Sequence, residues 1–238
     1  MLIAIEGVDK SGKETQTDLL LERLRKENRN ARKIEFPNYP SEAAGAIRMY
    51  LNGDFGANPD DVNPYAASVF FAVDRFASYK TDWEKFLNEG GIVVADRYTM
   101  SNMIHQGAKF SDVRERQLYV EWLIDLEFGK IGLPKPDIVI FLDLSMEIRE
   151  KLLKQSHNHK KTPATPTSPP SSFPLATPQS GADIHERDLE YLRRSHICAG
   201  EIASLLGWKR IDAGRGGALR PAGEIHEELY AAVAPLLK

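Results

Sequence analysis

Short apolar runs rich in valine and isoleucine recur along the chain and predict β-strands. Five such runs span residues 2–6, 33–36, 92–95, 138–142 and 208–212. The longer segments between them carry apolar residues at the spacing of an α-helix, for example Leu20, Leu21 and Leu24, and then Val69, Val73 and Phe76. Strands that alternate with helices predict parallel β-α-β units. We therefore expect an α/β fold in which a five-stranded parallel sheet is covered by helices on both faces.

Residues 157–182 break this pattern. They hold six of the 14 prolines and almost no periodic apolar residues. Because proline removes a backbone donor and fixes φ, we expect an extended, disordered insertion here, either passive or a specific binding element. A helical pattern resumes at Ile184. We therefore expect one domain over residues 1–238, with a lid region at 154–186 that contains the insertion.

The charge balance and the cysteine content exclude several classes of function. The chain has 31 basic and 34 acidic residues and a formal net charge of -3, which argues against a protein that coats nucleic acid. We therefore expect no nucleic-acid partner. The single cysteine, Cys198, excludes an internal disulfide and a cysteine-rich metal site, and we expect it to be a small buried residue.

The sequence shows no export or membrane signal. The chain begins with the strand-like run Leu2–Ile5 and lacks the basic start and longer apolar stretch of a signal peptide. It also lacks an apolar run of roughly 18 residues, the length that a transmembrane helix needs. We therefore expect a cytoplasmic protein with no membrane partner.

A phosphate-binding loop follows the first predicted strand. Its P-loop spacing is formed by Gly7, Val8, Asp9, Lys10, Ser11, Gly12 and Lys13. Glycines permit a tight turn, backbone N–H groups face the phosphates of ATP, and Lys13 bridges their outer oxygens. The next position usually holds a serine or threonine that binds Mg²⁺, but here it is Glu14, with Thr15 one place later. Glu14 either coordinates the metal, directly or through water, or points to solvent.

Three further segments place aromatic and cationic side chains at the same end of the predicted sheet. They are Phe36-Pro37-Asn38-Tyr39 after the second strand, Phe71 with Arg75 on one helix face, and Asp96-Arg97-Tyr98 after the third strand. Aromatic faces stack on a nucleobase, and arginines grip phosphate through paired N–H donors. The pair Tyr39 and Arg97 favours an acceptor that already carries phosphate.

In their order along the chain, these motifs resemble the thymidylate kinase family. The matching positions are Asp9 in the P-loop, Phe36-Pro37 with Tyr39, Phe71 with Arg75, Asp96-Arg97-Tyr98 with Ser101, and Asp183-Ile184-His185-Glu186, within residues 1–153 and 183–213. The resemblance implies a three-layer P-loop kinase fold with a mobile lid. It also implies a homodimeric enzyme that transfers the γ-phosphoryl group of Mg²⁺-bound ATP to dTMP, giving dTDP and ADP for dTTP synthesis.

The resemblance also implies roles for single residues. On the acceptor side, Phe71 stacks on thymine, Arg75 contacts the base, Phe36 and Pro37 wall the pocket, Ser101 and Asn102 line the base, and Tyr39 and Arg97 hold the phosphate. Asp9 lies near the sugar 3′-hydroxyl, the metal or both, and Glu186 lies near the metal or the phosphates. His105 stands where many family members carry tyrosine or phenylalanine, so it either contacts the substrate or bonds to a neighbour.

Phosphoryl transfer needs positioning and charge stabilisation rather than a protein nucleophile. We expect Lys13 to neutralise the migrating group and Arg97 to bridge the acceptor and the transferred phosphoryl. By the same resemblance, a second cation comes from the P-loop or from the lid. Lys10 is the candidate in the loop, and the candidates in or near the lid are Lys154, Lys160, Lys161 and Arg187.

Three other functions are compatible with parts of this pattern. One is a P-loop kinase that acts on a deoxynucleoside or on another monophosphate. Another is a nucleotide-dependent switch, which the absence of an Asn-Lys-x-Asp guanine-recognition motif disfavours. The third is a degenerate nucleotide-binding module, which the presence of Lys13, Arg97 and Asp9 disfavours.

Overall fold

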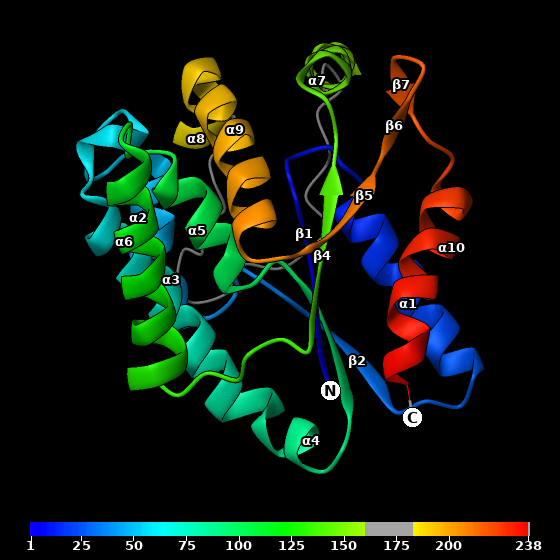
Figure 1. The fold of residues 1–238 in the computed structure, drawn as a ribbon. Helices are drawn as coiled ribbons and strands as arrows, with labels where there is room; N and C mark the ends of the chain where they lie inside the picture. The colour runs from blue at the N-terminus through cyan, green and yellow to red at the C-terminus, as the bar shows by residue number, and fades with distance from the viewer. Residues whose placement is uncertain (160–182, 238) are drawn as a thin grey trace, which may run out of the picture.

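The computed structural model describes residues 1–159 and 183–237 and has the predicted sheet at its centre. Five parallel strands lie in the order β2-β3-β1-β4-β5 (Figure 1). Their bounds are β1 Leu2–Gly7, β2 Ala31–Glu35, β3 Ile92–Asp96, β4 Ile138–Asp143 and β5 Lys209–Asp212. The α/β fold with five parallel strands is therefore confirmed, and the strand ends differ from the prediction by only a residue or two.

Helices connect these strands. They are α1 Lys13–Lys26, α2 Gly45–Asn52, α3 Pro64–Ser78, α4 Glu84–Asn88, α5 Thr99–Gly107, α6 Val113–Ile124, α7 Met146–His159, α8 Ile184–Arg187, α9 Leu189–Leu205 and α10 Ala222–Val233. Short 3₁₀ helices span Glu42–Ala44, Pro59–Asp61 and Ala234–Leu236, and a hairpin of β6 Gly214–Arg215 and β7 Ala218–Leu219 follows β5. Two π-helical segments, Tyr79–Trp83 and Asp125–Lys130, continue α3 and α6. No helix in the described part of the chain is long and apolar enough to cross a membrane.

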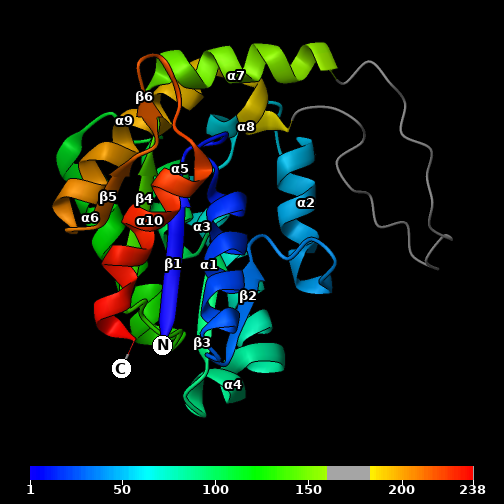
Figure 2. The same cartoon turned by 90° about the vertical axis from the view of Figure 1, so that its right-hand side faces the viewer.

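The central strand β1 is buried on both faces, which explains why it reads as one unbroken apolar run. Leu2 and Ala4 pack on one face, in a core that includes residues of α5, α6 and α9. Ile3 and Ile5 pack on the other face, in a core that includes residues of α1 and α10. Figure 1 shows these two helical layers on either side of the sheet, and Figure 2 shows α7 and α8 beyond the carboxyl ends of the strands. That edge is where such folds bind ligands.

Helix α3 is present as predicted, but the apolar residues that indicated it do not face the core. Val69 is 41% exposed, Val73 is 47% exposed and Phe76 is 42% exposed. Spacings of four and three residues put them on one side of the helix. The interior face of α3 is instead formed by small and polar residues, namely Ala67, Ser68, Ala72, Asp74, Arg75 and Ser78. We call the outward row Val69, Val73 and Phe76 the α3 stripe.

The predicted lid region is described only in part. Helix α7 runs to His159, past residue 157, where we expected the insertion to begin. The first proline of the segment is Pro163, and proline is the residue that ends a helix most effectively. Residues 160–182, on which the predicted disorder falls, lie outside the described residues, as do the side chains of Lys154, Lys160 and Lys161.

Cys198 is fully buried in α9, as the sequence predicts. Its Sγ donates to the Met103 carbonyl oxygen at 3.7 Å, and burial raises the pKa of the thiol to about 12. Because the thiolate is the reactive species, we expect a thiol reagent such as dithionitrobenzoate to leave the folded protein unmodified at pH 7.5. In denaturant it should release one equivalent of chromophore within minutes. Rapid modification of the folded protein would show that Cys198 is accessible and contradict this placement.

Candidate active site

The loop between β1 and α1 permits close approach of phosphate. A Cβ atom at Gly7 would lie 2.6 Å from the Leu142 carbonyl oxygen and 2.6 Å from Ser11 Oγ, so no larger residue fits there. Gly12 precedes α1 with φ of 89°, a left-handed conformation that glycine adopts without strain. The turn therefore leads directly into the amino end of α1, the arrangement whose N–H groups bind phosphate oxygens.

Lys13 is a buried cation at the start of α1. The residue is 8% exposed, and its Nζ donates to the Val8 carbonyl oxygen at 3.0 Å. Burial, followed by the nearby charge of Arg97, lowers the pKa of Lys13 to about 8. Two neighbouring cations with limited access to water repel each other unless an anion lies between them. The loop is therefore electrostatically suited to a polyanion such as the triphosphate of ATP.

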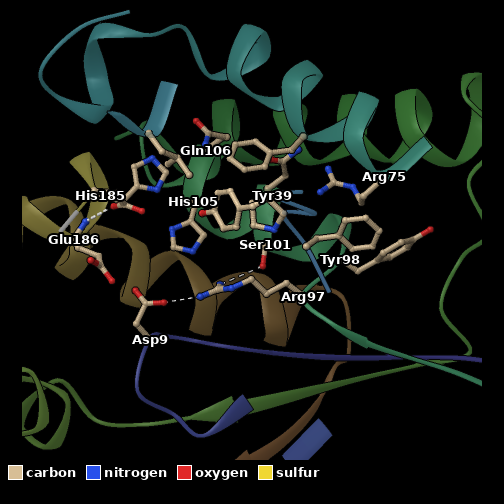
Figure 3. A pocket seen from close by; sticks show the side chains of 16 residues that line it. Asp9, Tyr39, Arg75, Arg97, Tyr98, Ser101, His105, Gln106, His185 and Glu186 are labelled. Atoms are coloured by element: carbon tan, nitrogen blue, oxygen red, sulfur yellow. Dashed lines mark hydrogen bonds and ion pairs between the residues drawn. The ribbon is translucent and has the colours of Figure 1, made fainter. Parts of the chain in front are cut away.

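Arg97 reaches the P-loop from the carboxyl end of β3. Its Nη2 atom lies 2.6 Å from Asp9 Oδ1, and its Nη1 atom donates to Ser101 Oγ at 3.5 Å. The backbone of Arg97 has φ of 67°, a left-handed conformation that costs a non-glycine residue roughly 1–2 kcal/mol. Strain of this kind persists where the surroundings fix a functional side chain in place. The contact with Asp9 brings the glycine loop and Arg97 to one cleft (Figure 3).

Glu6 holds the segment that carries Arg97, a role that the sequence did not indicate. Its buried carboxylate accepts hydrogen bonds from the Tyr98 N–H at 2.7 Å and from Ser101 Oγ at 2.8 Å. Burial raises the pKa of Glu6, whereas the charge of Arg97 opposes that rise. Ser101, predicted to line the base, therefore also links Glu6 to Arg97. An acidic residue within a buried strand was the available signal for this role.

A second arginine, Arg149 of α7, also binds Asp9. Its side chain is 2% exposed, its Nη2 lies 3.0 Å from Asp9 Oδ2, and its Nη1 donates to the Leu192 carbonyl oxygen at 3.3 Å. Burial alone would raise the pKa of Asp9, but the charges of Arg97, Lys13 and Arg149 outweigh burial and hold that pKa well below its usual range. Asp9 is thus an ionised carboxylate with an arginine on each oxygen.

A cavity of about 200 Å³ opens beside this cluster. All the residues predicted for the acceptor side line it, namely Asp9, Phe36, Pro37, Tyr39, Phe71, Arg75, Arg97, Ser101, Asn102 and His105. Glu186 of α8 lines it as well, so the exit of the predicted lid region borders the same space (Figure 3). Segments far apart in the sequence therefore form one site, as the order of the motifs predicts.

Arg75 lies in this cavity as one half of a buried ion pair. Its Nε and Nη2 donate to the two oxygens of Glu127 at 2.7 and 2.5 Å, and neither residue is more than 1% exposed. The Asn102 Nδ2 donates to the Ser68 carbonyl oxygen at 3.1 Å and to Glu127 at 3.4 Å. Phe71 packs its ring edge-on to Tyr50, with 6.3 Å between ring centroids. Glu127 was not among the predicted residues.

His105 lies in the wall of the cavity and stacks on His185, with ring centroids 5.5 Å apart and planes 16° apart. Burial, and then the charge of Arg97, lowers the pKa of His105 to about 3, so the ring is neutral near pH 7. Its Nδ1 has no hydrogen-bond partner among the described residues, whereas His185 Nε2 bonds to the Tyr50 hydroxyl at 2.9 Å. The Nδ1 of His105 is thus a buried polar atom without a hydrogen-bond partner among the described residues.

Lys10, the predicted second cation, is exposed and adopts a left-handed backbone with φ of 69°. Within residues 1–159 and 183–237 it has no ion pair or side-chain hydrogen bond, so its catalytic role stays a prediction. Arg187 is exposed on α8. Arg149 is the cation that the structure places against the P-loop acid Asp9 in addition to Arg97, and the sequence analysis did not select it.

The carboxylates that could face a metal fall into two groups. Asp9 has both oxygens bound by arginines, and Glu186 is exposed at the cavity edge. Glu14 is exposed on the first turn of α1, with Thr15 also exposed, and its charge acts on Asp96 at the end of β3. Burial raises the pKa of Asp96, and the charge of Lys13 opposes that rise. No three acidic, histidine or cysteine side chains form a metal cage in the described part of the chain.

Comparisons with known proteins agree with this geometry. Residues 5–166 match the family model described as thymidylate kinase. The chain is 30% identical to the thymidylate kinase of Mycobacterium tuberculosis over 209 residues, and this alignment covers 87% of each chain. It is 32% identical over 145 residues to the human thymidylate kinase, 61% of each chain. A solved structure of thymidylate kinase from Candida albicans superposes with a TM-score of 0.67, at 22% identity over 99% of this chain and 91% of that one.

Proposed function

Because the chain belongs to the thymidylate kinase family, we propose that it transfers the γ-phosphoryl group of ATP to dTMP, giving dTDP and ADP. This makes it an enzyme of the nucleoside monophosphate kinase class. The observation that carries the proposal is the contact of Arg97 with Asp9, since it joins the P-loop to the cavity that contains the acceptor-side residues.

The acceptor phosphate binds between Tyr39 and Arg97. Both side chains line the cavity, and the Tyr39 hydroxyl has no partner among the described residues. Burial raises the pKa of Tyr39 to about 12, so its hydroxyl stays protonated and donates to phosphate. Arg97 adds a charge-assisted bond, which is stronger than a bond between neutral groups. This end of the cavity favours a monophosphate over a free nucleoside.

The other end of the cavity has the hydrogen-bonding pattern that thymine requires. Arg75 uses Nε and Nη2 on Glu127, which leaves Nη1 as a donor for a base. Asn102 uses Nδ2 on two protein oxygens, which leaves Oδ1 as an acceptor. Thymine has an acceptor at O4 and a donor at N3, whereas cytosine has a donor at N4 and an acceptor at N3. The pair therefore suits thymine or uracil and opposes cytosine.

In the reaction, an oxygen of the dTMP phosphate attacks the γ-phosphorus of ATP and the bond to the β-γ bridging oxygen breaks. Lys13 and the loop amides hold the transferred group and the leaving ADP oxygens. Arg97 moves part of its interaction from Asp9 to the phosphates, and Arg149 supplies a second buried cation on the other Asp9 oxygen. No protein side chain forms a covalent bond.

Mg²⁺ usually binds one or two carboxylates together with substrate phosphates rather than an all-protein cage. Asp96 and Glu14, beside Lys13, fit that mode, because Asp96 has a carboxylate without a hydrogen-bond donor among the described residues. We propose these two residues, directly or through water, with Glu186 at the cavity edge. The ion would supply positive charge at the β- and γ-phosphate oxygens.

An acceptor panel tests the proposed function. Purified protein with ATP and Mg²⁺ is assayed for ADP release with dTMP, dUMP, dCMP, dGMP, AMP, UMP and thymidine. We expect dTMP to be the best acceptor and thymidine to be inactive. ADP release that no acceptor alters would identify a nucleotide-dependent switch instead, and thymidine outperforming dTMP would identify a nucleoside kinase.

We also propose that the enzyme is a homodimer that pairs through the α3 stripe. The stripe is an exposed apolar row on a helix whose other face is buried. In a two-fold dimer the same patch of each subunit faces its copy, so one row can bury itself against another. A two-fold contact of this kind would cover Val69, Val73 and Phe76 in both subunits at once.

Replacing Val73 with glutamate should therefore convert the dimer to a monomer, because two like charges would face each other across the two-fold axis. Val73 is 47% exposed, so the folded subunit should tolerate the change. Sedimentation velocity measures the mass, and Ile197→Glu, at an apolar residue of α9 that is 59% exposed, is the matched control. A wild-type monomer, or a Val73→Glu dimer, would refute pairing through the α3 stripe.

A further inference from the structure

Glu127 is a fully buried carboxylate behind the base end of the cavity. It lies in the π-helical segment Asp125–Lys130 that continues α6. A π-turn adds a residue to the helical repeat and so re-aims the side chains that follow, and such turns are frequent at functional sites. Here the neighbours Leu126 and Phe128 pack against the core, whereas Glu127 points between α3 and α5.

The carboxylate of Glu127 is saturated by donors from two other helices. Arg75 of α3 donates twice, at 2.7 and 2.5 Å, in a two-pronged pair. Thr99 of α5 donates its hydroxyl at 2.8 Å, and Asn102 of the same helix donates Nδ2 at 3.4 Å. One acid therefore fixes both side chains that face the base and the first turn of the helix that carries Asn102.

A buried ion pair of this kind is not explained by stability alone. Removing two charges from water is so unfavourable that replacement by apolar residues is often neutral or stabilising. What the pair does provide is orientation, because a carboxylate that binds Nε and Nη2 fixes the plane of the guanidinium group. Arg75 then keeps both N–H groups of Nη1 and one N–H of Nη2 as free donors, and the residue lines the cavity.

We propose that Glu127 is the positioning residue that sets base specificity, by fixing Arg75 as a hydrogen-bond donor to the 4-position of the pyrimidine; this rests on the proposed function. The keto oxygen of thymine or uracil accepts from the fixed Nη1. The 4-amino group of cytosine is itself a donor and faces an arginine that cannot turn away. Without Glu127, Arg75 can rotate, so both the attraction for thymine and the rejection of cytosine weaken.

The substitution Glu127→Gln tests this role with little change in shape. The amide oxygen of glutamine still accepts one hydrogen bond from Arg75. The amide nitrogen is a donor and would face a second N–H donor of the guanidinium group, so the two-pronged pair is lost. We expect KM for dTMP to rise about tenfold or more, the loss typical of one hydrogen bond to a charged group. The kcat with saturating dTMP and KM for ATP should stay within about threefold, since neither depends on Arg75. The ratio of kcat/KM for dTMP over dCMP should fall about tenfold.

Glu121→Gln is the matched control, because Glu121 is exposed on the adjoining helix α6. Thermal unfolding of each variant separates folding from recognition. Should Glu127→Gln fail to fold, Glu127→Asp keeps the charge but is one methylene too short for both prongs, and it should shift the same ratio in the same direction. A lower melting temperature with an unchanged ratio of kcat/KM for dTMP over dCMP would overturn this inference and leave the proposed function in place. A wild type inactive on dTMP would overturn both the inference and the proposed function.

Discussion

Replacing Arg97 with alanine should lower kcat about 10³-fold while changing the Kd for ATP by less than about threefold. A well-placed arginine contributes on this order because it stabilises the charge that is spread over the phosphoryl oxygens and the attacking and leaving oxygens in the transition state. Arg97 lies on the acceptor side of the P-loop, against Asp9 and in the wall of the cavity. Single-turnover phosphate transfer and titration with a fluorescent ATP analogue measure the two quantities separately.

The Arg97→Ala protein should remain folded, because Asp9 keeps its second partner Arg149. Arg193→Ala is the matched control, since Arg193 is a half-exposed arginine of α9 whose partners, Glu150 and Glu190, lie on the helices α7 and α9. Arg97→Lys should recover little of the rate because lysine lacks the forked geometry. Equal losses of kcat and of ATP affinity would contradict the role assigned to Arg97.

Replacing Lys13 with methionine should lower kcat/KM for ATP about 10³-fold or more and yet leave the ligand-free protein as stable as wild type, or more so. The lysine would contact the β- and γ-phosphates, so its loss removes both ground-state and transition-state interactions. Stability should not fall, because folding confines this cation to a site where burial and Arg97 lower its pKa to about 8 from 10.5.

The sign of that stability effect follows from proton linkage. Between pH 8 and 10.5 the unfolded chain binds a proton at Lys13 that the folded chain has released, so wild type gains stability as the pH rises through this window. Lys13→Met lacks that gain, so its advantage should be largest below pH 8 and shrink above it. Melting temperatures at pH 7 and pH 9.5, with Lys26→Met as the exposed control, measure this difference. A strongly destabilised Lys13→Met protein would contradict the electrostatic account.

The sequence predicted the features that depend on local patterns. The strand runs, the P-loop spacing and the motifs after β2 and β3 are short-range signals, and the parallel topology then brings their carboxyl ends to one edge. The α3 stripe shows the limit of periodicity. Spacing indicated the helix but not which apolar face is buried, because that depends on what packs against it.

The sequence did not predict the buried charges. Glu6, Arg149 and Glu127 are each at most 1% exposed, whereas glutamate and arginine are usually found at the protein surface. Their side-chain partners lie 25 to 140 positions away along the chain, from Asn102 for Glu127 to Asp9 for Arg149. Contacts of this kind arise only from tertiary packing, so no spacing in the sequence could identify them.

Transfer of label from γ-³²P-ATP is the most direct test of the central claim. The claim is that the P-loop and Arg97 hold the β-phosphate of ATP and the phosphate of dTMP on either side of the γ-phosphoryl group that is transferred. With dTMP present, we predict that label leaves ATP and appears in dTDP, with little inorganic phosphate. Label that accumulates as inorganic phosphate at the same rate with or without dTMP would contradict the claim.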